Sequence, residues 1–175
     1  MIRYLITDPS YYTSHPTKFR TRLLKAIRRH RPTHIALRDK TNPKLKKIAA
    51  RVADLDIIIN QDFKLARRIG KRRIHLTSSQ LPMAKALRRA GFEVWLSAHT
   101  PQDLKIARSS RVAYVTYSPI FFSPGKGEPL GLRSLRRRSR TYKKIIALGG
   151  VVHRSQIHAI KRARAAGFAS IRYFI

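Results

Sequence analysis

The chain has 175 residues, of which 43% are apolar and 9% aromatic, a globular composition that excludes general disorder. It has no cysteine, which excludes disulfides, thiolate catalysis and cysteine-ligated metal centres. Its 39 Lys and Arg against 8 Asp and Glu give an abnormal net charge of +31. No run approaches the roughly 20 apolar residues that span a bilayer, and the N-terminus lacks the pattern of a signal peptide. We therefore expect a cytoplasmic protein of one domain, residues 1–175.

The basic residues lie mostly on helix-like segments, where they surround apolar positions such as Phe19, Leu23 and Ile27. So high a charge usually indicates a nucleic acid or an anionic surface as partner. Because the charge is spread over all sides, we hypothesise that exposed acids have been replaced, by design or by drift, on a protein that did not evolve to bind nucleic acid. The alternative is a catalytically silent protein that binds nucleic acid or another polyanion non-specifically through its charge.

Short, nearly continuous apolar segments alternate with amphipathic helical patterns along the chain, as in parallel sheets that are covered on both faces. The predicted strands are Ile2–Thr7, His34–Arg38, Asp56–Asn60, Arg73–Leu76, Glu93–Leu96, Val112–Tyr117, Lys144–Leu148 and Phe168–Tyr173. The predicted helices lie near Thr17–His30, Pro43–Leu55, Phe63–Ile69, Pro82–Ala90, Pro101–Ser109, Leu132–Arg140 and Ser155–Ala166. Gly70, Gly91 and Gly167 follow three of these helices, where a left-handed C-cap is common.

This alternation predicts an α/β fold, a closed (β/α)8 TIM barrel, with an open flavodoxin-like sheet as the alternative. The last predicted strand ends close to Ile175, so we expect a minimal barrel that lacks the helix after strand eight. A groove should then remain between the first and seventh helices. It would be open to solvent or to a partner chain, for example in a homodimer.

In such a barrel the functional residues lie in the loops that follow the strands. Arg38 and Lys40 follow the second strand, where two cations suit a phosphate, although solvated surface charge is an equally simple interpretation. Asn60 follows the third strand and could hydrogen-bond a ligand, whereas Asp62 could hold a metal ion or cap the next helix. His75, on the fourth strand, is expected to be a core histidine with satisfied hydrogen bonds.

The later strands are followed by further candidates. His99 lies beside a predicted helix N-terminus, where it could transfer protons near neutral pH or have a structural role. The longest loop, residues 118–131, holds Ser123 and Lys126 among glycines that let backbone amides approach an anion. We interpret this loop as a lid over the site. The Gly149–Gly150 pair forms either a phosphate cradle or a tight turn.

Taken in order, these segments resemble the thiamine-phosphate synthase family, together with the related thiazole tautomerases. The matching landmarks are Tyr4–Asp8 (YLITD), Leu37–Lys40 (LRDK), Ile58–Asn60 (IIN), His75–Leu76 (HL), Ser97–Thr100 (SAHT), Tyr114–Phe121 (YVTYSPIF), Lys126 and Ala147–Gly150 (ALGG). Single fragments of this kind are weak signals, but this many in the right order at barrel spacing are specific.

The resemblance implies a transferase that joins hydroxymethylpyrimidine diphosphate to thiazole phosphate and releases diphosphate, usually with Mg²⁺. By position it assigns pyrimidine diphosphate binding to Arg38, Lys40, Asn60 and Lys126, with Lys126 also acting in catalysis. It further places Ser97 near the pyrimidine, Ser123 on a phosphate, and Gly149 and Gly150 on the thiazole phosphate. In the tautomerase alternative, which needs no metal, His99 would act as the acid or base.

The sequence departs from the family pattern at four positions. Gln61 and Gln80 stand where the family has magnesium-binding aspartates, and an amide oxygen is a poorer ligand for a hard cation than a carboxylate. Gly125 replaces a second hydroxyl of the loop, and the serine expected after the eighth strand falls near Phe174. We therefore expect Mg²⁺ dependence to be weakened or lost, with Asp62, one residue out of place, as the remaining candidate ligand.

Overall fold

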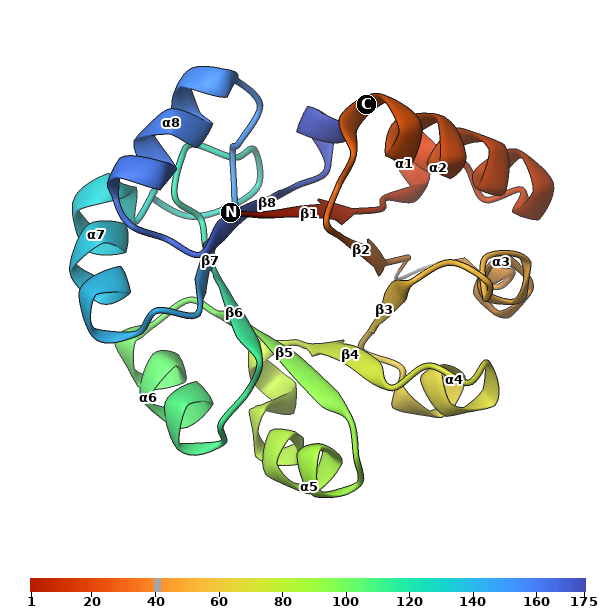
Figure 1. The fold of residues 1–175 in the computed structure, drawn as a ribbon, viewed down its shortest axis with the longest axis horizontal. Helices are drawn as coiled ribbons and strands as arrows, with labels where there is room; N and C mark the ends of the chain where they lie inside the picture. Colours follow the sequence, from red (N-terminus) through yellow and green to blue (C-terminus); the bar gives the residue numbers. More distant parts are fainter. Residues whose placement is uncertain (40–41) are drawn as a thin grey trace.

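Eight parallel strands form a closed barrel in a computed structural model that describes residues 1–39 and 42–175 (Figure 1). Lys40 lies outside the described residues. The strands are β1 (Ile2–Ile6), β2 (His34–Leu37), β3 (Ile57–Asn60), β4 (Arg73–Leu76), β5 (Glu93–Ala98), β6 (Tyr114–Tyr117), β7 (Ile145–Ala147) and β8 (Gly167–Ser170). Because β8 pairs with β1, the barrel prediction is confirmed and the open flavodoxin-like sheet is excluded.

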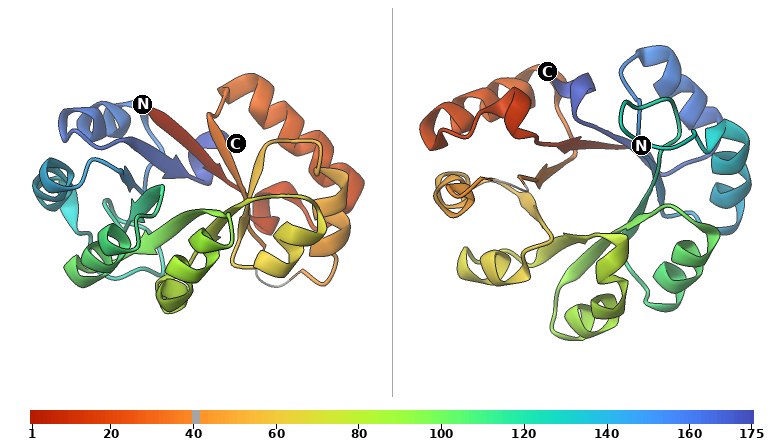
Figure 2. Two further views of the ribbon diagram at one scale, coloured as in Figure 1. Left: turned by 60° about the horizontal axis from the view of Figure 1, so that its bottom comes forward. Right: turned by 180° about the vertical axis from the view of Figure 1, so that it is seen from behind.

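The helices form a ring outside the barrel (Figures 1 and 2). They are α1 (Pro9–Tyr12), α2 (Pro16–His30), α3 (Leu45–Arg51), α4 (Phe63–Arg68), α5 (Ala84–Arg89), α6 (Pro101–Ser109), α7 (Gly131–Thr141) and α8 (Arg154–Arg162). Two 3-10 helices, η1 (Ser78–Met83) and η2 (Arg172–Phe174), complete the described elements. No helix in the described part of the chain is long and apolar enough to cross a membrane.

Alternating strand residues separate two hydrophobic cores, because successive side chains of a strand point to opposite faces. Tyr4, Ile58 and Trp95 belong to the cluster inside the barrel, and the larger cluster fills the space between barrel and helices. Trp95 is fully buried and satisfies its polar edge by donating from Nε1 to Glu93 Oε1 at 2.7 Å. The barrel is thus a packed core, and a ligand can be received only at its ends.

Local signals set most helix boundaries. At α6 the Thr100 hydroxyl accepts from Asp103 N–H while the Asp103 carboxylate accepts from Thr100 N–H, a reciprocal cap. Gly70 and Gly91 have positive φ at helix ends, as predicted. The prediction for Gly167 was wrong: it lies in β8, where an added Cβ would come within 3 Å of Ile2, and packing against β1 requires the glycine.

The remaining differences concern element lengths. The second long helix, predicted as Pro43–Leu55, is only α3 (Leu45–Arg51), and the last strand ends at Ser170 rather than Tyr173. The short elements α1, η1 and η2 were not predicted, because a single helical turn carries no hydrophobic period. For α1 a local signal existed, since Asp8 caps the turn through Ser10 N–H and Pro9 occupies its first position.

The first and seventh predicted helices are α2 and α8 of the structure. The groove expected between them is partly filled by the C-terminal segment. Phe174 is fully buried and stacks on Phe168, with ring centroids 5.7 Å apart. The Tyr12 hydroxyl donates to the Phe174 carbonyl at 3.2 Å. The cavity that remains, about 300 Å³, lies between α2 and this segment and has no residue of α8 in its lining.

Candidate functional site

Two adjoining cavities open at the carboxyl ends of the strands. The larger, about 660 Å³, brings together seven of the predicted site residues: Arg38, Asn60, Ser97, His99, Ser123, Lys126 and Gly149. The smaller, about 270 Å³, is lined by Gly150, Ser170 and Arg172 and shares Ser123 and Gly149 with the larger. Asp62 lines neither cavity, and Lys40 lies outside the described residues.

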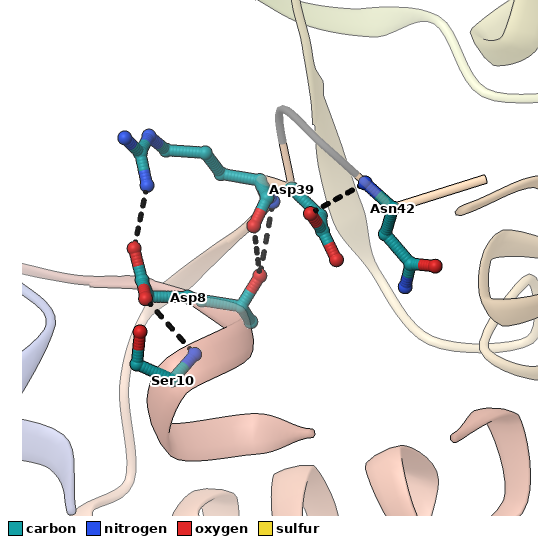
Figure 3. A network of polar contacts seen from close by, with 6 residues as sticks. Asp8, Ser10, Asp39 and Asn42 are labelled. Carbon is teal, nitrogen blue, oxygen red and sulfur yellow. Dashed lines mark hydrogen bonds and ion pairs between the residues drawn. The ribbon is translucent and has the colours of Figure 1, made fainter. Parts of the chain in front are cut away.

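Arg38 is anchored just after β2 by the two residues that follow β1. Its backbone N–H donates to Thr7 Oγ1 at 2.9 Å, and its Nη1 donates to Asp8 Oδ2 at 2.8 Å. Asp8 is itself held as the cap of α1, and beyond Arg38 the Asp39 carboxylate accepts from the backbone N–H of Asn42 (Figure 3). Since a guanidinium has five N–H donors, Arg38 is oriented by Asp8 while other donors stay free for an anion.

His75 joins the barrel interior to the cavity. Its Nδ1 is hydrogen-bonded to the Tyr4 hydroxyl at 2.9 Å, and its Nε2 to Ser97 Oγ at 3.1 Å and Thr116 Oγ1 at 3.3 Å. Burial, with a smaller effect from the charge of Arg38, lowers the pKa of His75 to about 4. The predicted core histidine is therefore confirmed: it is neutral at pH 7 and holds the Ser97 hydroxyl at the cavity wall.

The positions of the family's magnesium ligands are occupied by an internal amide network. Gln80 Oε1 accepts from Thr77 N–H at 3.2 Å, and Gln80 Nε2 donates to the backbone carbonyl of Gln61 at 3.2 Å. Asp62 Oδ1 accepts from Leu65 N–H at 2.8 Å, so Asp62 is the cap of α4, the alternative left open above. Two amides and one engaged carboxylate do not fit a hard cation that prefers carboxylate oxygens and water.

No three His, Asp or Glu side chains gather into a possible metal centre within residues 1–39 and 42–175. The donor chemistry at the ends of β3 and β4 therefore disagrees with the metal that the family resemblance implies.

His99 is fixed at the end of β5. Its Nδ1 lies 3.0 Å from the Ser118 carbonyl oxygen, which only accepts, so this contact favours the tautomer with a proton on Nδ1 and leaves Nε2 as the nitrogen that can accept a proton. Its backbone N–H donates to Asp103 Oδ2 at 2.8 Å, which ties it to the cap of α6. An exposed imidazole with one ring nitrogen oriented and the other free can act as a base toward a molecule in the larger cavity.

The loop after β6 lies directly on the Gly149–Gly150 turn. Phe121 N–H donates to the Gly149 carbonyl at 3.1 Å, and a Cβ added to Gly149 would lie 2.7 Å from Pro119 Cα. Gly150 has φ +69°, and a Cβ there would lie 2.8 Å from that of Phe121. Both glycines are therefore required by close approach.

The N–H groups of the same two glycines remain available to a ligand. Within the described part of the chain they donate to no protein acceptor, and both residues line the smaller cavity. Backbone amides of this kind suit an anion.

The end of β8 supplies residues that sequence reasoning missed. Ser170 is the last residue of β8, four residues before Phe174, near which the serine was expected. Its hydroxyl donates to the Val151 carbonyl at 2.6 Å and accepts from Tyr173 N–H, which holds this edge of the smaller cavity. Arg172 also lines that cavity. A serine that ends an apolar run, with a cation two residues later, was the available signal, and it was hidden because the strand was predicted too long.

Comparison with known proteins agrees with this architecture. The thiamine-phosphate synthase of Lactococcus lactis subsp. cremoris (strain MG1363) is 30% identical over 118 residues, which are 64% of this chain and 54% of that protein, so the match spans about half of its length. The thiamine-phosphate synthase of Rhizobium etli is 30% identical over 155 residues, covering 85% of this chain and 74% of that protein.

Among solved structures, the thiamine phosphate pyrophosphorylase from Pyrococcus furiosus has a TM-score of 0.77 at 14% identity, over 97% of this chain and 85% of that one, which is a likeness of fold. A sequence profile of the thiamine monophosphate synthase family matches residues 3–174. Since that match covers nearly the whole sequence, this chain belongs to the thiamine monophosphate synthase family.

Proposed function

We propose that the protein is a transferase that joins hydroxymethylpyrimidine diphosphate to thiazole phosphate with release of diphosphate. The observation that carries the proposal is the pair of adjoining cavities that share Ser123 and Gly149, because two phosphorylated substrates can then meet with their reacting ends together. Membership of the family supports it. Since both substrates are soluble phosphate esters, we place the reaction in the cytoplasm, carried out by the barrel as one domain.

In the first step the bond between the pyrimidine methylene and the diphosphate oxygen breaks, and its electron pair leaves with the diphosphate. Arg38 and Lys126 line the larger cavity and stabilise the charge that develops on the leaving group. Lys40, two residues after Arg38, adds a third cation in this proposal. Asn60 donates to the same substrate, and Ser97, oriented by His75, lies beside the pyrimidine ring.

In the second step the thiazole nitrogen gives its lone pair to the methylene cation, and the new C–N bond forms without a proton transfer. The free N–H groups of Gly149 and Gly150, with the guanidinium of Arg172, bind the thiazole phosphate in the smaller cavity. Ser123, on the wall shared by the two cavities, contacts a phosphate. Because a carbocation is captured by any water present, the loop of residues 118–131 serves as a cover.

The proposed chemistry relies on the cations of the chain rather than on magnesium, since Gln61 and Gln80 are neutral amides and the Asp62 carboxylate is engaged as the cap of α4. The test is turnover of the two substrates with Mg²⁺ and with a chelator, followed by the release of diphosphate and the formation of thiamine phosphate. We expect product under both conditions. Absence of product under either condition, from protein shown to be folded by circular dichroism, would contradict the proposal.

A second candidate is isomerisation of the thiazole ring, and the geometry of His99 favours it. The free Nε2 of a neutral imidazole can accept a ring proton and return it elsewhere, with no metal required. If this candidate is right, His99→Ala should lower isomerisation about 100-fold while leaving the joining reaction unchanged. Equal isomerisation by the variant and the parent protein would remove it.

A further inference from the structure

Most acidic residues of this chain are engaged within the fold. Asp8 and Asp54 form ion pairs with Arg38 and Arg20 at 2.8 and 2.5 Å, and Asp56 pairs with Arg73. The others form hydrogen bonds at helix starts, in the loop after β2 or to an indole: Asp39, Asp62, Asp103 and Glu93. Of the eight acidic residues, only Glu128, on the loop between β6 and α7, forms no hydrogen bond or ion pair in the described part of the chain. Few carboxylates are therefore available to neutralise the cations of the outer surface.

The acids are also distributed unevenly along the chain. All eight lie within residues 1–128, together with 27 of the 39 Lys and Arg. Residues 129–175 contain 12 Lys and Arg and no acid. This segment forms α7, β7, α8 and β8, and the two helices lie side by side on one flank of the barrel, at the left of Figure 1. The flank made by α7 and α8 thus belongs to a long segment that carries Lys and Arg without any Asp or Glu of its own.

The charged positions of α7 lie on one face. Its buried residues are Leu135 and Ser139, which face the barrel. Its exposed cations are Arg133, Arg136, Arg137 and Arg140, at spacings of three and four residues that place them in one row on the outside. The neighbouring α8 adds exposed cations at Arg154, Lys161 and Arg162. We call these seven residues the α7–α8 wall.

We propose that the α7–α8 wall binds the phosphate backbone of duplex nucleic acid, a role separate from the cavities at the strand ends. Guanidinium groups match phosphate in two-point hydrogen bonds, and a flank without carboxylates repels no phosphate. The row from Arg133 to Arg140 is about 10 Å long, a length over which a duplex presents about six charges.

A membrane partner is disfavoured by the composition of this wall. The exposed large hydrophobic residues of the described chain are Met1, Tyr11, Phe122 and Ile175, and none of them lies on α7 or α8. Binding in the plane of a membrane needs an apolar face to insert, and the apolar faces of both helices are turned to the core.

The test is binding of a fluorescein-labelled 20-base-pair DNA duplex of arbitrary sequence, measured by anisotropy between 50 and 300 mM KCl. The variant carries Arg133→Gln, Arg136→Gln, Arg137→Gln and Arg140→Gln. We expect its affinity at 100 mM KCl to fall at least about 100-fold. The slope of log affinity against log salt should decrease in magnitude by about 3 to 4, one counterion for each lost contact.

The matched control removes the same charge from an exposed row on another helix, α2, by Lys18→Gln, Arg22→Gln, Lys25→Gln and Arg29→Gln. It should lose less than about threefold in affinity. Equal losses in both variants would mean diffuse attraction and would overturn the proposal, as would no binding by the parent protein at 100 mM KCl. Binding to anionic phosphatidylglycerol vesicles is measured for the same proteins. If the α7 variant lost vesicle binding but kept its affinity for the duplex, the wall would bind a membrane instead.

Discussion

The two sides of the barrel mouth hold polar groups in opposite ways. At the ends of β3 and β4, the Gln80 amide bonds to backbone groups of Thr77 and Gln61, and Asp62 caps α4, so these two side chains are engaged by nearby backbone. At the ends of β7 and β8, the N–H groups of the Gly149–Gly150 turn face the smaller cavity and donate to no acceptor in the described chain.

This difference bears on where a ligand can gain binding energy. A donor that is already bonded within the protein must break that bond to bind a substrate, whereas a donor that faces the cavity exchanges only a bond to water. With amides at positions 61 and 80, the ends of β3 and β4 offer a hydrogen-bond network around Gln80 rather than a cluster of carboxylates. The anion-binding capacity of the other side comes from its backbone and does not depend on those side chains.

Gly150→Ala should have the largest effect, because the geometry at the ends of β7 and β8 depends on this glycine. The new Cβ would collide with Phe121 and Phe122 at a φ of +69°. We expect a loss of about 3 kcal/mol in the free energy of unfolding and loss of activity. Gly70→Ala is the matched control, since its φ is +71° with no atom within 4 Å of the new Cβ, and it should cost about 1 kcal/mol. Urea denaturation of both variants measures the difference, and similar losses would refute close approach as the cause.

Lys126→Met tests the cation of the long loop. Lys126 lines the larger cavity, so its removal should lower kcat/KM for the pyrimidine diphosphate about 100-fold by removing charge from the leaving group. The free energy of unfolding should change by less than about 0.5 kcal/mol. Lys85→Met, an exposed lysine on α5, serves as the control and should leave the kinetics unchanged. A kinetic defect of the same size in both variants would argue against a specific role.

His75, on β4, should make the free energy of unfolding depend on pH. The pKa of His75 is about 4 in the fold and near 6.5 in the unfolded chain, so between these values only the unfolded chain takes up the proton. The free energy of unfolding should therefore fall by about 2 kcal/mol as the pH decreases from 7 to 5. In His75→Gln this contribution disappears, and a smaller slope remains from His30 and His34, whose pKa values burial also lowers. Identical slopes for parent and variant would contradict the assignment.

The smallest effect is expected from restoring carboxylates, with Gln61→Asp and Gln80→Asp combined. Aspartate tolerates the φ of +67° found at position 61, so this change is compatible with the backbone. The Tm of the double variant should rise by a few degrees on addition of Mg²⁺, about 1 kcal/mol, whereas the parent protein should not respond. Calcium is the control cation. A parent protein that responds to Mg²⁺ as strongly would show that the amide network does bind metal.

The sequence predicts the barrel well because the evidence for each strand and helix is spread over several residues. Eight apolar runs at regular spacing survive errors of two or three residues at each end, and the reciprocal cap at Thr100 marks α6 to the residue. The order of the candidate residues at the strand ends also survives, which is why Arg38, Asn60 and Lys126 were found and line one cavity.

The parts that could not be predicted depend on distances in space. Nothing local separates Gly167, which is required by the approach of Ile2, from a glycine that ends a helix. The contact between the Gln80 amide and the Gln61 backbone carbonyl likewise joins loops from different strands. Ser170 and Arg172 were missed for a simpler reason, since an error of three residues in the end of β8 moved the expected site toward a residue that lies in the core.

The pairing of β1 with β8 has a consequence for how this protein folds during its synthesis. Ile2 is paired with Gly167, so nearly the whole chain must be synthesised before the barrel can close. Until then β1 and β7 present unpaired strand edges, which can pair with other chains. Closure over so long a separation is slow, because its entropic cost precedes the contacts that repay it. Because a side chain at Gly167 would collide with Ile2, this glycine is required for the closure, and we expect chaperone dependence to be greatest before β8 has been synthesised.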